Sequence, residues 1–410
     1  MKMNYTSIIA ILFSIILYSI FVVIIIEIAI AEEAIGYQAG HKTTFVASPH
    51  NRVANISYNN ASSVDPQLAT DANNIYIVWS DDGLGNADIL FTKSTDGGKT
   101  FSKPVKLSNS IGTSAAPVLN LNGNNVYVAW HDDTYKNFEI YFTKSTDGGK
   151  TFSKPVKLSQ DFVNNSTTID SEFPSIASSP SALYTVWQEN STGFFDILLR
   201  KSTDGGKTFS KPVNLSNNSG SSAFPRVAVY GNSPYVVWQD NVTGNFEILL
   251  RKSTDGGKTF SKPVNLSKNS GISSDPAIFI YEKNVYLVWD DDSPGNADIL
   301  FTKSTDGGEA FSKPVNLSNN IRGSFDPVLA ISKNDIYVAW DDDSPGNADI
   351  LFTKSTDRGN SFSIKPINLS KNVGRSLYPD VAVSRSNNSY IVWSDDTPGN
   401  YEVLLLRNVR

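Results

Sequence analysis

The stretch Ile75-Tyr76-Ile77-Val78-Trp79 is a short apolar run that ends in tryptophan, and similar runs recur along most of the chain. Seven tryptophans mark them, at successive spacings of 51, 57, 51, 51, 51 and 53 residues: Trp79, Trp130, Trp187, Trp238, Trp289, Trp340 and Trp393. A period of about fifty residues indicates an internal repeat in which each unit forms one piece of supersecondary structure.

Each repeat unit contains four short apolar runs separated by turn residues. In the first unit, the first run begins at Pro66, the second ends at Trp79, the third covers residues 88–92 and the fourth covers residues 104–108. Such β-type runs are typical of propeller blades, whereas helical repeats would show apolar stripes with a period of 3.6. We therefore expect an all-β fold built from four-stranded blades.

The two ends of the array predict the number of blades. The seventh unit stops after its third run, at residues 401–406, and the missing fourth run stands at the start of the array. There, Val53-Ala54-Asn55-Ile56-Ser57 matches Pro212-Val213-Asn214-Leu215-Ser216. An N-terminal strand that completes the last blade would close the ring and remove its open edges. We predict a seven-bladed β-propeller over residues 52–410.

The first 31 residues predict a membrane segment. Residues 8–26 carry no charge and are long enough to cross about 30 Å of hydrocarbon as a helix. One interpretation is a signal anchor, which the length favours; the other is a secretory signal cleaved after Ala31, since Ala29-Ile30-Ala31 resembles a cleavage site. We expect residues 1–31 to form this hydrophobic helix and residues 32–51 to be a linker.

The turn after the third run carries a recurring octapeptide, Ser94-Thr95-Asp96-Gly97-Gly98-Lys99-Thr100-Phe101. Copies begin at Ser145, Ser202 and Ser253, and altered copies at Ser304 and Ser355. We expect the aspartate to accept backbone N–H groups, the glycines to adopt positive φ, and the phenylalanine to pack between sheets. The motif resembles the Asp-box, or BNR repeat, of the sialidase superfamily. In that family the box lies away from the catalytic centre, so the resemblance implies the fold and not the activity.

Composition excludes several kinds of chemistry. The chain has no cysteine and only three histidines, which excludes disulfides, thiolate metal sites and cysteine nucleophiles and makes imidazole catalysis a poor hypothesis. With 35 Lys+Arg against 41 Asp+Glu, the net charge of −6 argues against nucleic acid as a partner.

Acidic residues are expected to gather at one end of the ring. They stand two and nine positions after each tryptophan, in the turn between the second and third strands, whereas lysines and the octapeptide turns belong to the opposite end. The N-terminal strand enters from the basic end. We therefore expect that end to face an anionic membrane and the acidic end to face outward.

The acidic turns are also candidate calcium sites, because they combine carboxylates, an amide and a glycine within ten residues. The candidate ligands are Asp291, Asp292, Asp298, Asp342, Asp343 and Asp349. The alternative is a hairpin turn whose acids accept backbone N–H bonds. We favour this alternative, because the spacing matches no EF-hand loop and an acidic turn occurs in every blade.

A single site on the axis of a propeller has to break the symmetry of the repeat, so residues that differ between blades are the candidates. The positions that flank the proline of each first strand, and the loops near them, differ most. The candidate ligand-binding residues are Arg226, Arg322, Arg375, Asp275, Asp326 and Asp380.

The resemblance also implies a hydrolase hypothesis. Sialidases hold a carboxylate with three arginines and use a tyrosine nucleophile, a glutamate and an acidic proton donor; the candidates here are Tyr378, Glu172 and Asp65. However, the family has six blades and an Arg-Ile-Pro motif, to which Phe224-Pro225-Arg226-Val227 is only weakly similar. We therefore expect no sialidase activity.

The leading hypothesis is a non-catalytic, membrane-anchored or secreted extracellular module that binds a glycan, a protein or an ion through its acidic end. The alternatives are a sialidase-like glycoside hydrolase and a structural component of the cell envelope. Numerous glycosylation sequons agree with an extracellular glycoprotein: they start at Asn55, Asn60, Asn164, Asn190, Asn214, Asn217, Asn241, Asn265, Asn316, Asn368 and Asn387.

Overall fold

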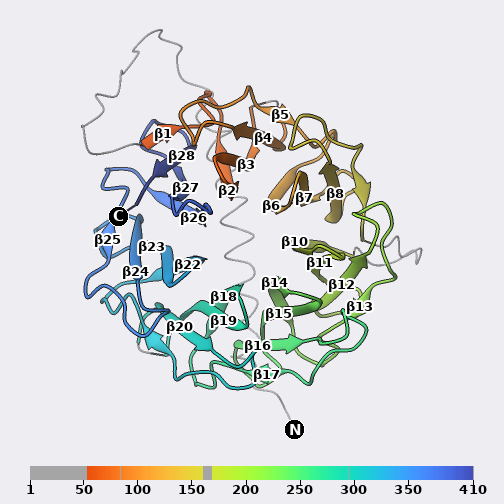
Figure 1. Ribbon diagram of the computed structural model, residues 1–410, viewed down its shortest axis with the longest axis vertical. Helices are drawn as coiled ribbons and strands as arrows, with labels where there is room; N and C mark the ends of the chain where they lie inside the picture. Colours follow the sequence, from red (N-terminus) through yellow and green to blue (C-terminus); the bar gives the residue numbers. More distant parts are fainter. Residues whose placement is uncertain (1–52, 84, 160–168, 294, 410) are drawn as a thin grey trace. The chain divides into compact units, whose positions relative to one another are not determined.

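The computed structural model describes residues 53–83, 85–159, 169–293 and 295–409. Within these residues, 28 strands form seven four-stranded antiparallel sheets, and Figure 1 shows the sheets arranged as blades around a common axis. The prediction of an all-β, seven-bladed propeller is therefore confirmed. No helix in the described ranges is long and apolar enough to span a membrane, and the expected segments 1–31 and 32–51 lie outside those ranges.

The strands of each sheet follow one another from the axis outward. The first strands are β2 (Ser63–Asp71), β6 (Ser114–Asn122), β10 (Ser171–Ser179), β14 (Ser222–Tyr230), β18 (Ser273–Tyr281), β22 (Ser324–Ser332) and β26 (Ser376–Val383). The second strands are β3 (Asn74–Asp81), β7 (Asn125–Asp132), β11 (Ala182–Glu189), β15 (Ser233–Asp240), β19 (Asn284–Asp291), β23 (Asp335–Asp342) and β27 (Ser389–Asp395).

The outer half of each sheet has a long third strand and a very short fourth one. The third strands are β4 (Asp88–Ser94), β8 (Glu139–Ser145), β12 (Asp196–Ser202), β16 (Glu247–Lys252), β20 (Asp298–Ser304), β24 (Asp349–Ser355) and β28 (Glu402–Arg407). The fourth strands are β5 (Val105–Lys106), β9 (Val156–Lys157), β13 (Val213–Asn214), β17 (Val264–Asn265), β21 (Val315–Asn316), β25 (Ile367–Asn368) and β1 (Val53–Asn55).

The hydrophobic core is divided into layers between neighbouring sheets. One layer joins Tyr184 and Leu199 of one sheet to Val236 and Trp238 of the next. All seven tryptophans are at most 1% exposed, so each one is a central packing element of a layer. The second strands are buried on both faces, which explains why they are continuous apolar runs and do not alternate.

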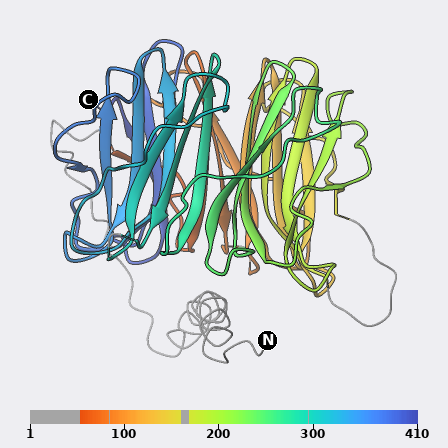
Figure 2. The ribbon, with the colours of Figure 1, turned by 90° about the horizontal axis from the view of Figure 1, so that it is seen from below.

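Strand pairing identifies the two ends of the ring. Ser63 pairs with Asp81, and Asp81 with Asp88, so the acidic turns and the starts of the first strands share one end, here called the acidic end. Ile75 pairs with Ser94, which places the octapeptide turns at the opposite end. Figure 2 shows the strands running between these two ends.

The strand β1 takes the outermost place in the seventh sheet, whose order is β1-β28-β27-β26. Val53 pairs with Leu406 and Asn55 with Leu404, and the Ile56 N–H donates to the Val403 carbonyl over 2.8 Å. That this pairing keeps the ring closed stays a prediction.

The octapeptide turns have the expected internal bonds. Asp96 accepts the N–H groups of Lys99 and Thr100 over 2.9 and 3.0 Å and the Thr100 hydroxyl over 2.6 Å. Phe152, from the second copy, packs edge-on against Phe91 of the preceding sheet at 4.8 Å between ring centroids. The motif therefore joins neighbouring blades as well as closing a turn.

Candidate functional site

A β-bulge interrupts each first strand near the acidic end. The pairing register shifts around the proline, and the residue before it has a positive φ of 46–53°. The seven residues at this position are Asp65, Ala116, Phe173, Phe224, Asp275, Asp326 and Tyr378. Positive φ is uncommon outside glycine, but this bulge occurs in every blade and belongs to the scaffold. Only the side chains that it presents differ.

Six carboxyl groups form what we call the axial acidic cluster: Asp65, Asp275, Asp290, Asp326, Asp341 and Asp380. They come from first or second strands of the fifth, sixth, seventh and first sheets. Each first strand contacts that of the next sheet around the ring. Asp326 is close enough to Asp290, Asp341 and Asp65 to respond to them electrostatically, so groups from three sheets meet near the axis.

Burial raises the pKa of every member of this cluster. Desolvation raises the pKa of Asp65 to about 6 and that of Asp380 to about 7. It also raises the pKa of Asp275, Asp290, Asp326 and Asp341, and neighbouring carboxylates raise these four values further. Like charges close together in a low dielectric cannot all ionise, so some of these carboxyls hold a proton at neutral pH while others carry a negative charge.

Arg226 supplies positive charge to this cluster. It follows Pro225 on β14, is half-buried, and lowers the pKa values of Asp275, Asp326 and Asp380. These three carboxyls belong to three different sheets, so the guanidinium lies close to the axis. One cation against six carboxyls leaves the cluster under-neutralised.

Rings occupy the other arc of the axial end. His131, Phe138, Phe173 and Phe224 form the axial aromatic cluster, with Phe173 and Phe224 4.6 Å apart and His131 and Phe173 5.4 Å apart between centroids. The Phe173 N–H donates to Nδ1 of His131 over 3.3 Å. Burial lowers the pKa of His131 to about 4, so the imidazole is neutral.

In several sheets the residue after the tryptophan connects neighbouring blades, and Asp290 departs from this pattern. Gln188 and Gln239 accept the N–H groups of Phe224 and Asp275 in the next blade, over 3.0 and 3.1 Å. Asp290 is 5% exposed; its Oδ2 accepts the Ser274 hydroxyl over 2.7 Å, whereas its Oδ1 has no partner among the described residues. Asp290 therefore has a buried carboxyl oxygen without a partner in the described part of the chain, and Asp275 is an electrostatic neighbour of this carboxyl.

The structure brings together only some of the predicted site residues. Arg226, Asp275, Asp326, Asp380 and Asp65 meet at the axial end. Arg322 and Arg375 lie in exposed connections between sheets. There the Arg322 carbonyl accepts a hydrogen bond from the Asn296 side-chain amide, and the Arg375 backbone N–H donates to the Asp396 carboxylate.

The two other proposed catalytic residues are separate from one another. The Tyr378 backbone N–H is bonded to Asp341 of the preceding blade. Glu172 is on β10, where it accepts Gln188 over 3.0 Å, and burial raises its pKa to about 7. Part of the long connection before Glu172 lies outside the described residues.

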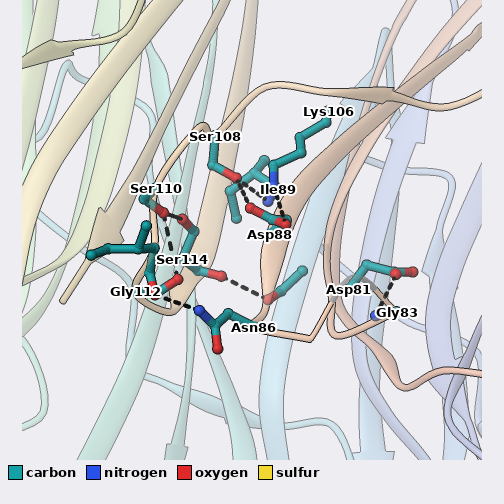
Figure 3. A network of polar contacts seen from close by, with 12 residues as sticks. Asp81, Gly83, Asn86, Asp88, Ile89, Lys106, Ser108, Ser110, Gly112 and Ser114 are labelled. Atoms are coloured by element: carbon teal, nitrogen blue, oxygen red, sulfur yellow. Dashed lines mark hydrogen bonds and ion pairs between the residues drawn. The ribbon is translucent and has the colours of Figure 1, made fainter. Parts of the chain in front are cut away.

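The repeated acids of the turns belong to the scaffold. Asp291 accepts the Trp289 indole, the Ser273 hydroxyl and the Asn269 amide over 2.7–3.1 Å. Figure 3 shows the same role in the first blade, where Asp81 accepts the Gly83 N–H and Asp88 binds Ser108 and Lys106.

The remaining calcium candidates have similar partners. Asp342 accepts Trp340, Ser324 and Asn320, and Asp298 and Asp349 each accept a serine and an asparagine. Asp292 caps the Ile272 N–H over 2.6 Å. In the part of the chain that the structure describes, no three His, Asp or Glu side chains are arranged to hold a metal ion. These contacts agree with the hairpin interpretation.

Two groups of side chains have partners that were not expected. The lysines at the ends of the third strands donate to carbonyls of the next octapeptide turn, as Lys93 does to Gly148 over 2.8 Å and Lys201 to Gly256 over 2.7 Å. The sequon residues Asn316 and Asn368 donate to Asp298 and Asp349. Both groups hold the scaffold together.

Sequence reasoning missed Asp290, Asp341 and His131 as site residues. All three directly follow a tryptophan, at a position that also holds Ser80, Gln188, Gln239 and Ser394. That variation between blades is the same signal that identified Asp275 and Asp326. The same variation, at the end of the second strand, marks these three residues.

No protein-family model matches the chain, and no curated protein matches it. Among solved structures, a protein of unknown function from Dyadobacter fermentans is similar with a TM-score of 0.53 and 15% identity, over 87% of this chain and 99% of that one. The phage phi92 endosialidase has a TM-score of 0.53 and 11% identity, over 87% and 69%. A Trypanosoma rangeli sialidase has 0.50 and 14%, over 75% and 56%. The fold is thus similar to that of sialidase and endosialidase propellers.

Proposed function

We propose that this chain is a sialidase-like Asp-box propeller that acts as a non-catalytic binding module, for a glycan, a protein or an ion. One observation supports this function most strongly. A sevenfold repeated bulge presents carboxyl groups on one arc of the axial end and aromatic rings on the other, so a symmetric scaffold carries one asymmetric site. The acids can exchange protons and the rings can stack against a ligand, and both properties suit binding without requiring a reaction.

The same site is unsuitable for a sialic acid substrate. A sugar carboxylate needs charge-assisted, preferably bidentate bonds from several guanidinium groups that converge on one point. Arg226 meets the axial cluster, whereas Arg322 and Arg375 belong to exposed connections. Six carboxyls also oppose the approach of an anion.

The experiment is a hydrolysis assay on the full chain purified in mild detergent. We expect a fluorogenic sialoside to remain intact between about pH 4 and 8, the range over which carboxyl and imidazole groups titrate. Turnover above the blank that is lost in Arg226→Ala or Tyr378→Phe would replace this proposal with the hydrolase.

The proposed location is the cell surface. Residues 8–26 would anchor the chain, or be removed with the signal after Ala31, and the acidic end would face outward. We expect a shift in mass on enzymatic deglycosylation of the native protein if the sequons are occupied. Protease protection of the propeller in intact cells would contradict the surface location.

A further inference from the structure

We infer that the axial end of the propeller binds an organic ammonium ion with an apolar or aromatic body, its cation among Asp275, Asp290 and Asp326 and its body against Phe173 and Phe224. This inference rests on the proposed binding function and names its ligand class. The carboxyl groups and the rings belong to neighbouring arcs of one site.

The charge at the site selects a cation. Arg226 is a single positive group near Asp275, Asp326 and Asp380, while Asp290, Asp341 and Asp65 add three further carboxyl groups. A carboxylate brought out of water gains stability from an opposite charge within a few ångströms. A bound ammonium ion would provide that charge.

Asp290 provides the vacant hydrogen-bond acceptor. It is 5% exposed, and its Oδ1 receives no donor from the described residues. The equivalent residues Gln188 and Gln239 reach the bulge of the next blade, and Asp275 and Asp326 are electrostatic neighbours of Asp290, so the Asp290 carboxyl belongs to the cluster. Buried polar atoms in native proteins nearly always have partners, and an ammonium group offers up to three N–H donors.

The ligand body is selected by the rings. Phe224 and Arg226 are on β14, which lies directly beside β18 with Asp275. The aromatic and acidic arcs therefore meet at this border. Phe173 and Phe224 are half-buried and pack against each other with their ring centroids 4.6 Å apart, and aromatic rings attract both apolar groups and cations. Metal ions would use the carboxyls but not the rings.

Arg226 distinguishes this ligand from an anionic sugar. An ammonium ion competes with the guanidinium for the same carboxyls, so Arg226→Gln should strengthen its binding. A carboxylate ligand would depend on the guanidinium, so the same substitution should abolish its binding. The two ligand classes predict opposite signs for one variant.

The test measures binding of benzylammonium to the full chain in mild detergent at pH 8, by calorimetric titration. Benzyl alcohol, calcium and sialyllactose are the comparison ligands. We expect benzylammonium to bind and the others not to bind at equal concentration. Asp326→Asn should weaken benzylammonium about tenfold, the effect of one charge-assisted hydrogen bond.

Two further variants complete the experiment. Glu282→Gln removes one charge from an exposed turn at the opposite end of the fifth blade, which carries Asp275 and Asp290, and should leave the affinity unchanged. Phe173→Leu should reduce the preference for benzylammonium over methylammonium. Thermal unfolding of each variant establishes that it is folded.

The inference is overturned if benzylammonium fails to bind, if Asp326→Asn and Glu282→Gln bind it equally, or if Arg226→Gln weakens it. Binding of calcium, benzyl alcohol or sialyllactose that is lost in Asp326→Asn would overturn the ammonium ligand and leave the binding function standing. Sialoside turnover would overturn the binding function itself.

Discussion

Replacing Asp290 with asparagine should stabilise the protein at pH 8. The carboxyl is 5% exposed, has one acceptor oxygen without a partner, and lies close to Asp275 and Asp326. A buried acceptor without a partner costs about 1–3 kcal/mol, and Asp290→Asn removes the charge while its amide oxygen can still accept Ser274. We expect the free energy of unfolding to rise by about 1–3 kcal/mol.

The gain should depend on pH, with a definite sign. Burial raises the pKa of folded Asp290, so the folded chain binds a proton that the unfolded chain has released above about pH 4. The wild-type residue therefore lowers stability progressively as pH rises from about 4 to 8. At pH 4 the folded carboxyl is protonated and the unfolded carboxyl is about half protonated, so the substitution should change little.

The assay is thermal and urea unfolding at pH 4, 6 and 8. Unfolding entropy of about 2.1 cal/mol/K per residue over residues 53–410 gives about 0.75 kcal/mol per K, so Tm should rise by about 1–4 °C at pH 8. Asp291→Asn is the control, because Asp291 accepts four side-chain bonds and its replacement should destabilise the fold. Destabilisation by Asp290→Asn at pH 8, or an equal gain at pH 4, would refute the reasoning.

Three further outcomes are expected. The wild-type chain should be most stable between about pH 4 and 6. Threonine and serine hydroxyl bonds lower the pKa values of the turn acids, such as Asp96 and Asp204, in the folded chain. Below this pH range these acids become protonated and the fold loses the stability that their bonds contribute. Above this range the axial acids ionise, which destabilises the fold. A Tm that rises steadily to pH 8 would contradict this. Removing residues 1–57 should leave an aggregation-prone ring, since β1 pairs with β28, whereas removing residues 1–40 should not; equal stability of the two truncations would refute the closure. Melting should be the same in millimolar calcium and in chelator, because the turn acids already have protein partners; a calcium-dependent rise in Tm would restore the metal site.

The fold could be predicted because its signals are local and repeated. A unit of 51 residues with one tryptophan, a fixed octapeptide and four apolar runs specifies a blade, and seven copies specify the ring. The match of residues 53–57 to the fourth strands also indicated where β1 would pair. Each of these signals can be counted along the chain.

Side-chain partners that are far apart in the sequence could not be predicted in the same way. Asp81 and Asp291 read as surface acids, yet they are 3% and 0% exposed because serines 18 residues earlier in the chain bind them. Lys93 reads as membrane-facing charge, but it donates to a carbonyl 55 residues away. Such contacts depend on how strands pair within a sheet and how adjacent sheets pack, which no local pattern contains.

Locating a bound ammonium ligand tests the central claim most directly. Crystals soaked in 4-bromobenzylammonium can be measured at the bromine absorption edge, so that anomalous scattering marks the ring of the ligand. We predict one bromine peak beside Phe173 and Phe224, with the ammonium nitrogen within hydrogen-bonding distance of Asp290 or Asp326. A peak at the outer acidic turns instead, or no peak at concentrations that saturate binding in solution, would contradict the assignment of the axial end as the binding site.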